Sequence, residues 1–307
     1  MEHANHQHVP TLSVLMTVFN GRKYVREAIE SVLSQTYRDF EFILIDDGST
    51  DESHYIAWEY ATQDRRIRLI SRPNKGLTKS LNEGLISVRG KYVARMDADD
   101  VCLPQRFEKQ VKFLNANDDH VLVGCRCMLV DPDGFPICEK RDIVFTHEEI
   151  DSGLMRMSWP VVHPAVIMRT DALRKVGGYN ERYRTNQDHD LFLRLAEVGK
   201  LANLDEVLLL YRQHFESVGF TKVELQTNTV LEIAKAAHAR RGVPIPGNFK
   251  AGPASVLHPR EHHRNWTWWA LAAHNIPTAR RHAFALLRNS PLSAQSWRAM
   301  YCAVRGH

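Results

Sequence analysis

Short apolar runs alternate with stretches of helical periodicity between Leu12 and Gly124. Val25, Ile29 and Val32 recur every three or four positions, the spacing that places side chains on one face of a helix. The predicted strands are residues 12–18, 42–45, 68–70, 92–96 and 121–125, and the predicted helices are residues 23–35, 77–88 and 105–114. This alternation predicts an α/β fold, a doubly wound and mostly parallel sheet with helices on both faces.

The pattern changes beyond this region. Residues 131–134 read Asp-Pro-Asp-Gly, a strong turn signal that predicts a hairpin. Residues 143–219 are of mixed α+β character, and the chain after them is helical. Breaks in that helical part are expected at Pro244, Pro246 and Gly247, and helix starts are expected at Pro277 and Pro291.

Charge divides the chain into unequal parts. Residues 221–307 contain 12 Lys/Arg and 3 Asp/Glu, a balance of +9, and four of the six tryptophans. The preceding residues contain 28 and 33, a balance of −5. We therefore expect a disordered N-terminus over 1–10, an α/β domain over 11–220 with its boundary near Gly219, and a basic, Trp-rich helical region over 221–307.

The composition is that of a globular protein. Of 307 residues, 44% are hydrophobic and 25% are charged. The sequence has no apolar run of the length that spans a bilayer, and its first ten residues lack the apolar core of a signal peptide. Five cysteines occur without a C-x-x-C pair, and Cys125 and Cys127 lie on one strand face, which favours buried thiols over a metal site. We expect a cytoplasmic protein.

The most informative stretch is Asp97-Ala98-Asp99-Asp100, at the end of a predicted strand. Three carboxylates this close repel one another unless a cation lies among them. Hard oxygen ligands of this kind suit Mg²⁺ or Mn²⁺, and open α/β sheets bind ligands beyond the carboxyl ends of their strands. The alternative is a solvated acidic turn that caps the next helix.

Two common nucleotide-binding sites are excluded. The chain has no G-x-G-x-x-G after the first strand, where Thr17-Val18-Phe19-Asn20-Gly21 stands instead, and it has no P-loop. Hydride transfer to a dinucleotide and phosphate transfer at a Walker-type site therefore lose most of their support.

Several motifs occur together in a recognisable order. They are SVLMTVFN at 13–20, AIESVLSQTY at 28–37, IDDGSTD at 45–51, NKGL at 74–77 and GKYVARMDADD at 90–100. Over residues 11–220 the chain resembles the family-2 inverting glycosyltransferases of the GT-A fold. The resemblance implies a metal-dependent transfer of a sugar from a nucleoside-diphosphate sugar, with a UDP-sugar the first expectation, to an acceptor hydroxyl.

The resemblance also implies roles for residues on the donor side. Thr17, Phe19 and Asp47 would hold the base and ribose, whereas Asp46 would serve the turn. Lys75 would lie near phosphate, although a solvated lysine is an equal alternative. The acidic motif, Asp97, Asp99 and Asp100, would bind the donor ribose and a Mn²⁺ or Mg²⁺ ion on the diphosphate. His214, near the end of the resembling region, would be a further ligand of this ion.

The catalytic base implied by the resemblance lies in Asn186-Gln187-Asp188-His189-Asp190, where Gln187 replaces the family's glutamate. At about 100° per residue, Asp188 shares a helix face with Leu191 and Leu195, which must point inward. Asp190 precedes Arg194 by four residues, the spacing of a surface ion pair. We therefore expect Asp188 to be the base. Residues of the acceptor pocket are expected at Trp159-Pro160 and His163-Pro164, where packing is an equal explanation.

The resemblance implies an acceptor that is a glycan or a lipid-linked glycan of surface polysaccharide or lipopolysaccharide, and no nucleic-acid partner is expected. Two other functions are open: a catalytically silent nucleotide- or glycan-binding module on the same fold, and a nucleotidyltransferase. The basic C-terminal region has two interpretations. It packs on the catalytic domain through Ala270, Ala273, Ala283 and Leu287, or it makes peripheral contact with a partner or the inner membrane face.

Overall fold

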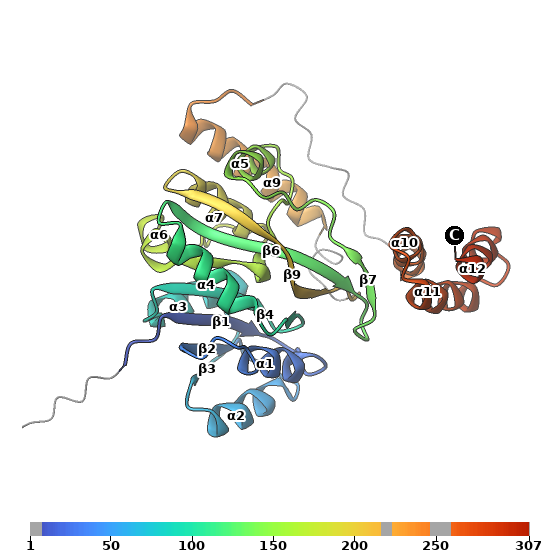
Figure 1. Ribbon diagram of the computed structural model, residues 1–307, viewed down its shortest axis with the longest axis horizontal. Helices are drawn as coiled ribbons and strands as arrows, with labels where there is room; N and C mark the ends of the chain where they lie inside the picture. The colour runs from blue at the N-terminus through green and yellow to red at the C-terminus, as the bar shows by residue number, and fades with distance from the viewer. Residues whose placement is uncertain (1–7, 216–222, 246–258, 307) are drawn as a thin grey trace, which may run out of the picture.

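The structure is a computed structural model that describes residues 8–215, 223–245 and 259–306. Within them a nine-stranded sheet has the order β3-β2-β1-β4-β8-β6-β9-β5, with β7 paired to β6 (Figure 1). The strands are β1 (Leu12–Val18), β2 (Phe40–Asp46), β3 (Ile67–Ser71), β4 (Tyr92–Asp97), β5 (Val101–Cys102), β6 (His120–Val130), β7 (Pro136–Glu139), β8 (Ile167–Arg169) and β9 (Lys200–Arg212). Strands β1 to β4 are parallel, as are β6 and β9, whereas β5, β7 and β8 run antiparallel to their neighbours.

Helices cover both faces of this sheet, as the sequence predicts. The elements are α1 (Val25–Leu33), α2 (Ser53–Gln63), α3 (Leu77–Ser87), α4 (Arg106–Ala116), α5 (His147–Met155), α6 (Thr170–Lys175), α7 (Gln187–Ala196), α9 (Val223–Arg241), α10 (Pro259–Ala272), α11 (Ile276–Asn289), α12 (Ala294–Arg305) and the 3₁₀ turn η1 (His163–Ala165). One core joins the sheet to α1, α2 and α4, and a second joins it to α3, α5, α6, α7 and α9. Along β1, Val14 and Met16 enter the first core and Leu15 the second, because strand side chains alternate between faces.

The predicted strands and helices are present, with ends shifted by a few residues. The largest change is β6, which extends beyond 125 because it pairs along its length with β9. The hairpin predicted at 131–134 joins β6 to β7. The short strand β5 separates the acidic motif from α4, which begins later than expected. The five cysteines are free thiols, four of them buried, as predicted.

The termini differ in detail from the expected boundaries. Residues 1–7 and Gly219 lie outside the described residues, as do Pro246 and Gly247. The described chain begins at His8, before the expected start of the domain. Helix α11 carries Pro277 in its first turn as predicted, whereas α12 begins three residues after Pro291.

The C-terminal region divides into two parts. Helix α9 joins the second core of the α/β domain, where Ile233 and Ala237 are buried. Helices α10 to α12 form a third core with β7, and Figure 1 shows them beside this strand, away from the helices that cover the sheet. Ala270, Ala273 and Ala283 contribute to it as expected, and Leu286 is buried there rather than Leu287. No described helix has the length and apolar character needed to cross a membrane.

Candidate active site

The carboxyl ends of the parallel strands bring the predicted donor-side residues together. Strand β1 lies between β2 and β4, and Thr17 is in register with Ile45 and Asp97. Phe19 and Asp47 are each the first residue beyond their strands. The Thr17 side chain is buried, whereas Phe19 is 53% exposed and presents an apolar ring at this edge. The strand ends thus gather the donor-side residues although they are far apart in the sequence.

The acidic motif forms a compact carboxylate cluster. Oxygen atoms of Asp97, Asp99 and Asp100 all lie within 4.8 Å of one another, and this is the only such group among the described residues. Asp100 is 1% exposed, and its Oδ1 accepts a hydrogen bond from the backbone N–H of Arg212 at 2.9 Å. Its Oδ2 is buried and has no hydrogen-bond partner. A buried carboxylate oxygen without a donor, in a group of three carboxylates, fits a hard divalent cation.

Burial and mutual repulsion shape the charges of this cluster. Burial raises the pKa of Asp100 well above its usual value, and the carboxylates of Asp99 and Asp97 raise it further. Burial also raises the pKa of Asp97, against the opposing effect of Arg95. A cation that binds among these carboxylates would offset both effects, which is the behaviour expected of a metal site.

Two buried arginines that the sequence analysis missed hold the cluster in place. Arg95 is 1% exposed and forms an ion pair with Asp97. Arg212 donates from Nε to the backbone carbonyl of Asp99 at 2.8 Å and pairs with Glu27 at 2.6 Å. Arg95 could have been predicted, because a charge within a buried apolar strand requires a partner. The role of Arg212 depends on the pairing of β9 with β6, and no local sequence pattern indicates that pairing.

His214 lies at the edge of the cluster, as predicted. Its Nε2 is 2.8 Å from Oδ2 of Asp99, and its ring centroid is 5.2 Å from that of Tyr24. Tyr211 also faces the site, although the sequence analysis did not select it. Burial raises the pKa of Tyr211 well above its usual value, and repulsion from Asp100 and the other site carboxylates adds to this effect.

Asp47 organises a loop on the donor side. Its carboxylate accepts hydrogen bonds from the backbone N–H groups of Lys75 and Gly76, at 2.8 and 3.0 Å, and forms an ion pair with Arg72. Gly76 has φ +88°, a conformation that favours glycine. The Lys75 ammonium lies 3.4 Å from Glu83. Asp46 instead accepts from the backbone of Ser49 at 3.0 Å, the turn role that the sequence predicts.

Asp188 stands in the first turn of α7, and Leu191 and Leu195 of the same helix are buried as predicted. The side chain of Asp188 is partly exposed, and burial of its carboxyl raises its pKa. The Asp188 charge also raises the pKa of Asp97, so the two carboxylates are close enough to repel each other. The candidate base therefore lies on the same side as the acidic cluster.

The surface position expected for Asp190 is wrong. Its ion pair with Arg194 is present at 2.6 Å, but Asp190 is only 3% exposed. Arg194 also donates to the backbone carbonyl of Val176 at 2.6 Å. The helical-wheel argument assigned this side of α7 to solvent, whereas the contact of Arg194 with Val176 shows that the end of α6 packs against it. The Asp190–Arg194 pair is therefore an internal structural contact.

The two segments expected on the acceptor side differ in exposure. Trp159 is 45% exposed, and its ring centroid is 5.8 Å from that of His189. His163 is buried and its Nε2 lies 2.7 Å from the hydroxyl of Tyr179. Burial lowers the pKa of His163, and the charge of Arg95 lowers it further. Of these residues, Trp159 is the one with a surface that an acceptor could contact.

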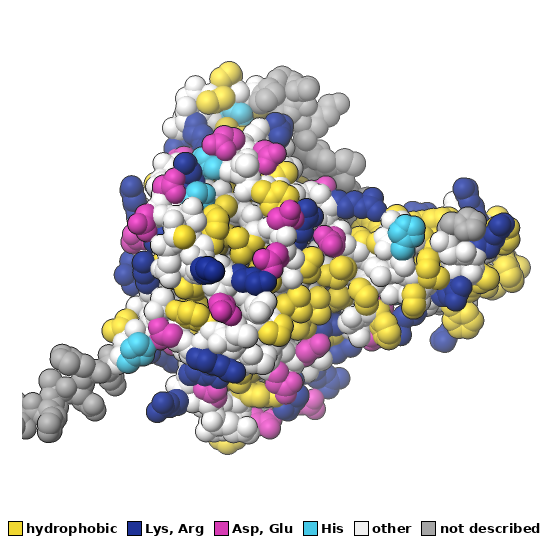
Figure 2. Space-filling view, viewed as in Figure 1, with side chains coloured by type: hydrophobic (Ala, Val, Ile, Leu, Met, Phe, Trp, Pro, Cys, Tyr) yellow, Lys and Arg dark blue, Asp and Glu magenta, His cyan; other side chains and the backbone are white. Residues whose placement is uncertain are grey.

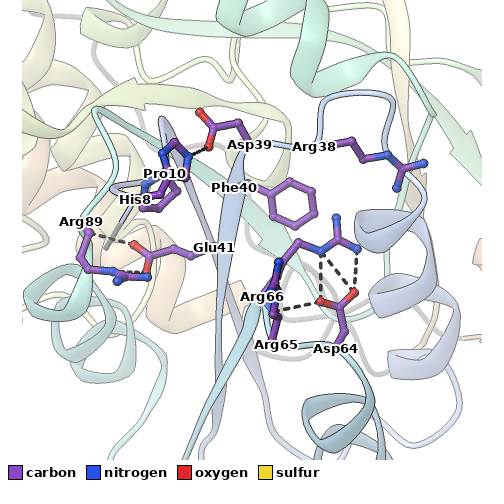
Figure 3. A pocket seen from close by; sticks show the side chains of 10 residues that line it. All are labelled: His8, Pro10, Arg38, Asp39, Phe40, Glu41, Asp64, Arg65, Arg66 and Arg89. Carbon is purple, nitrogen blue, oxygen red and sulfur yellow. Dashed lines mark hydrogen bonds and ion pairs between the residues drawn. The ribbon is translucent and has the colours of Figure 1, made fainter. Parts of the chain in front are cut away.

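A separate hollow of about 450 Å³ lies at the opposite end of β2, around Phe40 and Glu41 (Figure 3). Its carboxylates already have basic partners: Asp64 is 2.7 Å from Arg66, and Glu41 is 2.7 Å from Arg89. Because the strand's amino end forms this hollow, it is distinct from the edge that carries the acidic cluster.

The fold and the carboxylate edge are those of a GT-A type glycosyltransferase. The chain belongs to this class by sequence as well: residues 13–176 match the model of Glycosyl transferase family 2, so the protein is a member of that family. It is 38% identical over 209 residues to EpsE of Bacillus subtilis, whose name assigns it to the glycosyltransferases; the match covers 66% of this chain and 73% of EpsE. It is 26% identical over 269 residues to the chondroitin synthase of Escherichia coli, and this match covers 87% of this chain and 38% of the synthase.

Solved structures are similar in fold. TarS residues 1–349 from S. aureus, in complex with UDP, has a TM-score of 0.56 at 15% identity, and the match covers 97% of this chain and 92% of that TarS fragment. The mannosyltransferase PcManGT from Pyrobaculum calidifontis, in complex with GDP-Man and Mn²⁺, has a TM-score of 0.56 at 20% identity. This match covers 97% of this chain and 86% of the PcManGT chain. At these identities the likeness shows the shared fold.

The buried position of Asp190 leads to a stability prediction. Asp190→Asn leaves the Arg194 charge without its partner and should lower the free energy of unfolding by about 3 kcal/mol, as for one partner of a buried pair. Asp119→Asn removes an exposed carboxylate 2.7 Å from Lys200 and should change the free energy of unfolding far less, because solvent screens this pair. Urea denaturation of both variants measures these changes, and equal small losses would contradict the structural role of Asp190.

Proposed function

We propose that this glycosyltransferase moves a sugar from a nucleoside-diphosphate sugar to an acceptor hydroxyl with inversion at the anomeric carbon. The observation that carries this proposal is the meeting of three carboxylates and Asp188 at the edge that also carries Thr17 and Asp47. A UDP-sugar is the proposed donor. Support for a nucleotide donor comes from the fold shared with TarS bound to UDP and PcManGT bound to GDP-Man.

The donor would lie across the strand ends. Phe19 would provide an apolar wall for the base, and Thr17 and Asp47 would bind the base and ribose. Asp47 would also keep the loop at Lys75 and Gly76 next to the donor, through the hydrogen bonds that its carboxylate accepts. The partly exposed Asp97 would accept a hydrogen bond from the ribose.

Mn²⁺ or Mg²⁺ would be held by Asp97, Asp99 and Asp100, with His214 next to Asp99. The orphaned oxygen of Asp100 and the proximity of the three carboxylates support this set. When bound, the ion would offset the charge that develops on the departing nucleoside diphosphate. Arg95 and Arg212 would keep the carboxylates in position during the reaction.

Asp188 would be the general base. Its carboxylate would take the proton of the acceptor hydroxyl while the oxygen attacks the anomeric carbon from the side opposite the leaving diphosphate. One displacement with one base requires no covalent intermediate and gives inversion. Trp159 would contact the acceptor sugar with its exposed face.

The acceptor is proposed to be a glycan or a lipid-linked glycan in the assembly of a cell-surface polysaccharide or lipopolysaccharide. The similarity to a chondroitin synthase supports a polysaccharide product. We place the reaction in the cytoplasm, at the inner face of the membrane, where a lipid-linked acceptor would be available.

A test of the base compares Asp188→Asn with wild type. The substitution keeps the shape of the side chain, so donor affinity should stay within about twofold, whereas kcat should fall by about 10²–10⁴-fold because the proton acceptor is lost. Asp119→Asn, which changes an exposed carboxylate, is the matched control. Normal turnover of Asp188→Asn would contradict its role as base.

Metal dependence and reaction type are tested together by product analysis. Excess EDTA should abolish turnover and Mn²⁺ should restore it, because the leaving diphosphate needs a counter-charge. The released product should be a nucleoside diphosphate. Pyrophosphate would indicate a nucleotidyltransferase, and binding without any turnover would indicate a silent module.

A further inference from the structure

The helices α11 and α12 have an inverted distribution of side-chain size. Most of their buried apolar positions against α10 and β7 are alanines, Ala279, Ala283, Ala299 and Ala303, each 0% exposed, and Leu286 is the one large apolar side chain of these two helices buried with them, at 5% exposed. A helical hairpin whose only role is packing would place its largest apolar side chains inside, because burial stabilises in proportion to apolar area. Here, apart from Leu286, the large apolar side chains are partly or mostly exposed.

The exposed apolar residues gather on one end of the molecule. On α12, Trp297, Tyr301 and Val304 are 57%, 60% and 58% exposed at i, i+4 and i+7 positions, so they form one stripe. Leu292, in the turn between the helices, is 99% exposed, and Phe284 of α11 is 62% exposed. Figure 2 shows hydrophobic and basic side chains at this end of the molecule.

The two helices bring their exposed faces side by side. Arg280, near the start of α11, donates to the backbone carbonyls of Ala303 and Val304 at the end of α12, at 3.0 and 2.8 Å. The helices are therefore antiparallel neighbours, and Phe284, one turn after Arg280, lies on the same stripe of α11. The apolar residues of both helices belong to one surface.

Basic side chains flank this surface. Residues 276–305 contain five arginines and no Asp or Glu. Arg281 is directed to the hairpin, where it pairs with Asp133. Arg305 stacks on Tyr301, 5.4 Å from its ring centroid. Arg298, together with Arg264 and Trp268, lines a hollow of about 350 Å³ that has the charge and size for an anionic headgroup.

We propose that α11, α12 and the turn between them form a surface that docks on an anionic phospholipid membrane. An apolar stripe flanked by arginines is the pattern of helices that lie in a bilayer interface, and each basic residue adds attraction to anionic lipid. A second copy of the chain would bring the exposed Arg288, Arg298 and Arg305 against the same three arginines. Binding to a nucleic acid would not bury the exposed aliphatic side chains of Leu292 and Val304.

The contact surface is separate from the catalytic residues and is linked to them through the β6–β7 turn. Arg281 pairs with Asp131 and Asp133 in this turn, and Arg212 of the active site donates to the carbonyls of Asp131 and Pro132 at 3.5 and 3.4 Å. Docking of α11 and α12 would thus fix the orientation of the active site relative to the membrane.

Cosedimentation of the full-length protein with phosphatidylcholine vesicles, with and without phosphatidylglycerol, tests the proposal. The protein should pellet with the anionic vesicles at low salt, remain in the supernatant with neutral ones, and dissociate at high salt. Arg288→Glu with Arg298→Glu should lower vesicle affinity at least about 25-fold, because each arginine contributes about fivefold. Phe284→Ser with Leu292→Ser should lower it at least about tenfold.

Matched control substitutions are Ile86→Ser, at an 85% exposed position of α3, and Lys112→Glu, at an exposed position of α4. Both should bind vesicles as wild type does. Thermal melting and donor affinity should be unchanged in every variant, because the substituted side chains are exposed. The proposal is overturned if wild type stays in the supernatant with anionic vesicles, if the controls lose as much binding as the tail variants, or if nucleic acid but no vesicle is bound.

Discussion

The arrangement of the active site depends on one electrostatic constraint, the repulsion among three carboxylates at the end of β4. Without compensation, three acidic side chains within 4.8 Å would separate or become protonated. Arg95, buried beneath the strand end, balances Asp97, and the backbone N–H of Arg212 binds Asp100. One oxygen of Asp100 remains without a donor. The protein thus offsets only part of the negative charge and leaves a place for a cation.

The strands and helices that carry the site follow from local pattern. Buried parallel strands read as apolar runs, and amphipathic helices show their period, so the sheet, the hairpin and the acidic edge could be predicted from the sequence. Asp47, Asp188 and His214 were selected through resemblance, and they lie at the expected edge. How each acts in the reaction is a proposal that the variants test.

What the sequence could not predict depends on contacts between distant segments. Asp190 is buried, and its partner Arg194 donates to the carbonyl of Val176 at the end of α6, a neighbour that no helical wheel contains. The role of Arg212 requires the register of β9 against β6. The loop contacts of Asp47 require a turn that is 28 residues away along the chain. The division of the C-terminal region also depends on contacts between distant segments, since α9 joins the second core and the last three helices pack on β7.

The most direct measurement of the central claim is calorimetric titration of nucleotide into the full-length protein, with UDP and GDP used separately. With Mn²⁺ present, wild type should bind one of them, and removal of the ion or the change Asp99→Asn should weaken binding by at least about tenfold, because the diphosphate then faces the carboxylates without a counter-charge. Equal affinity with Mn²⁺, with EDTA and in Asp99→Asn would contradict the account, since the carboxylate cluster would then have no part in holding the donor.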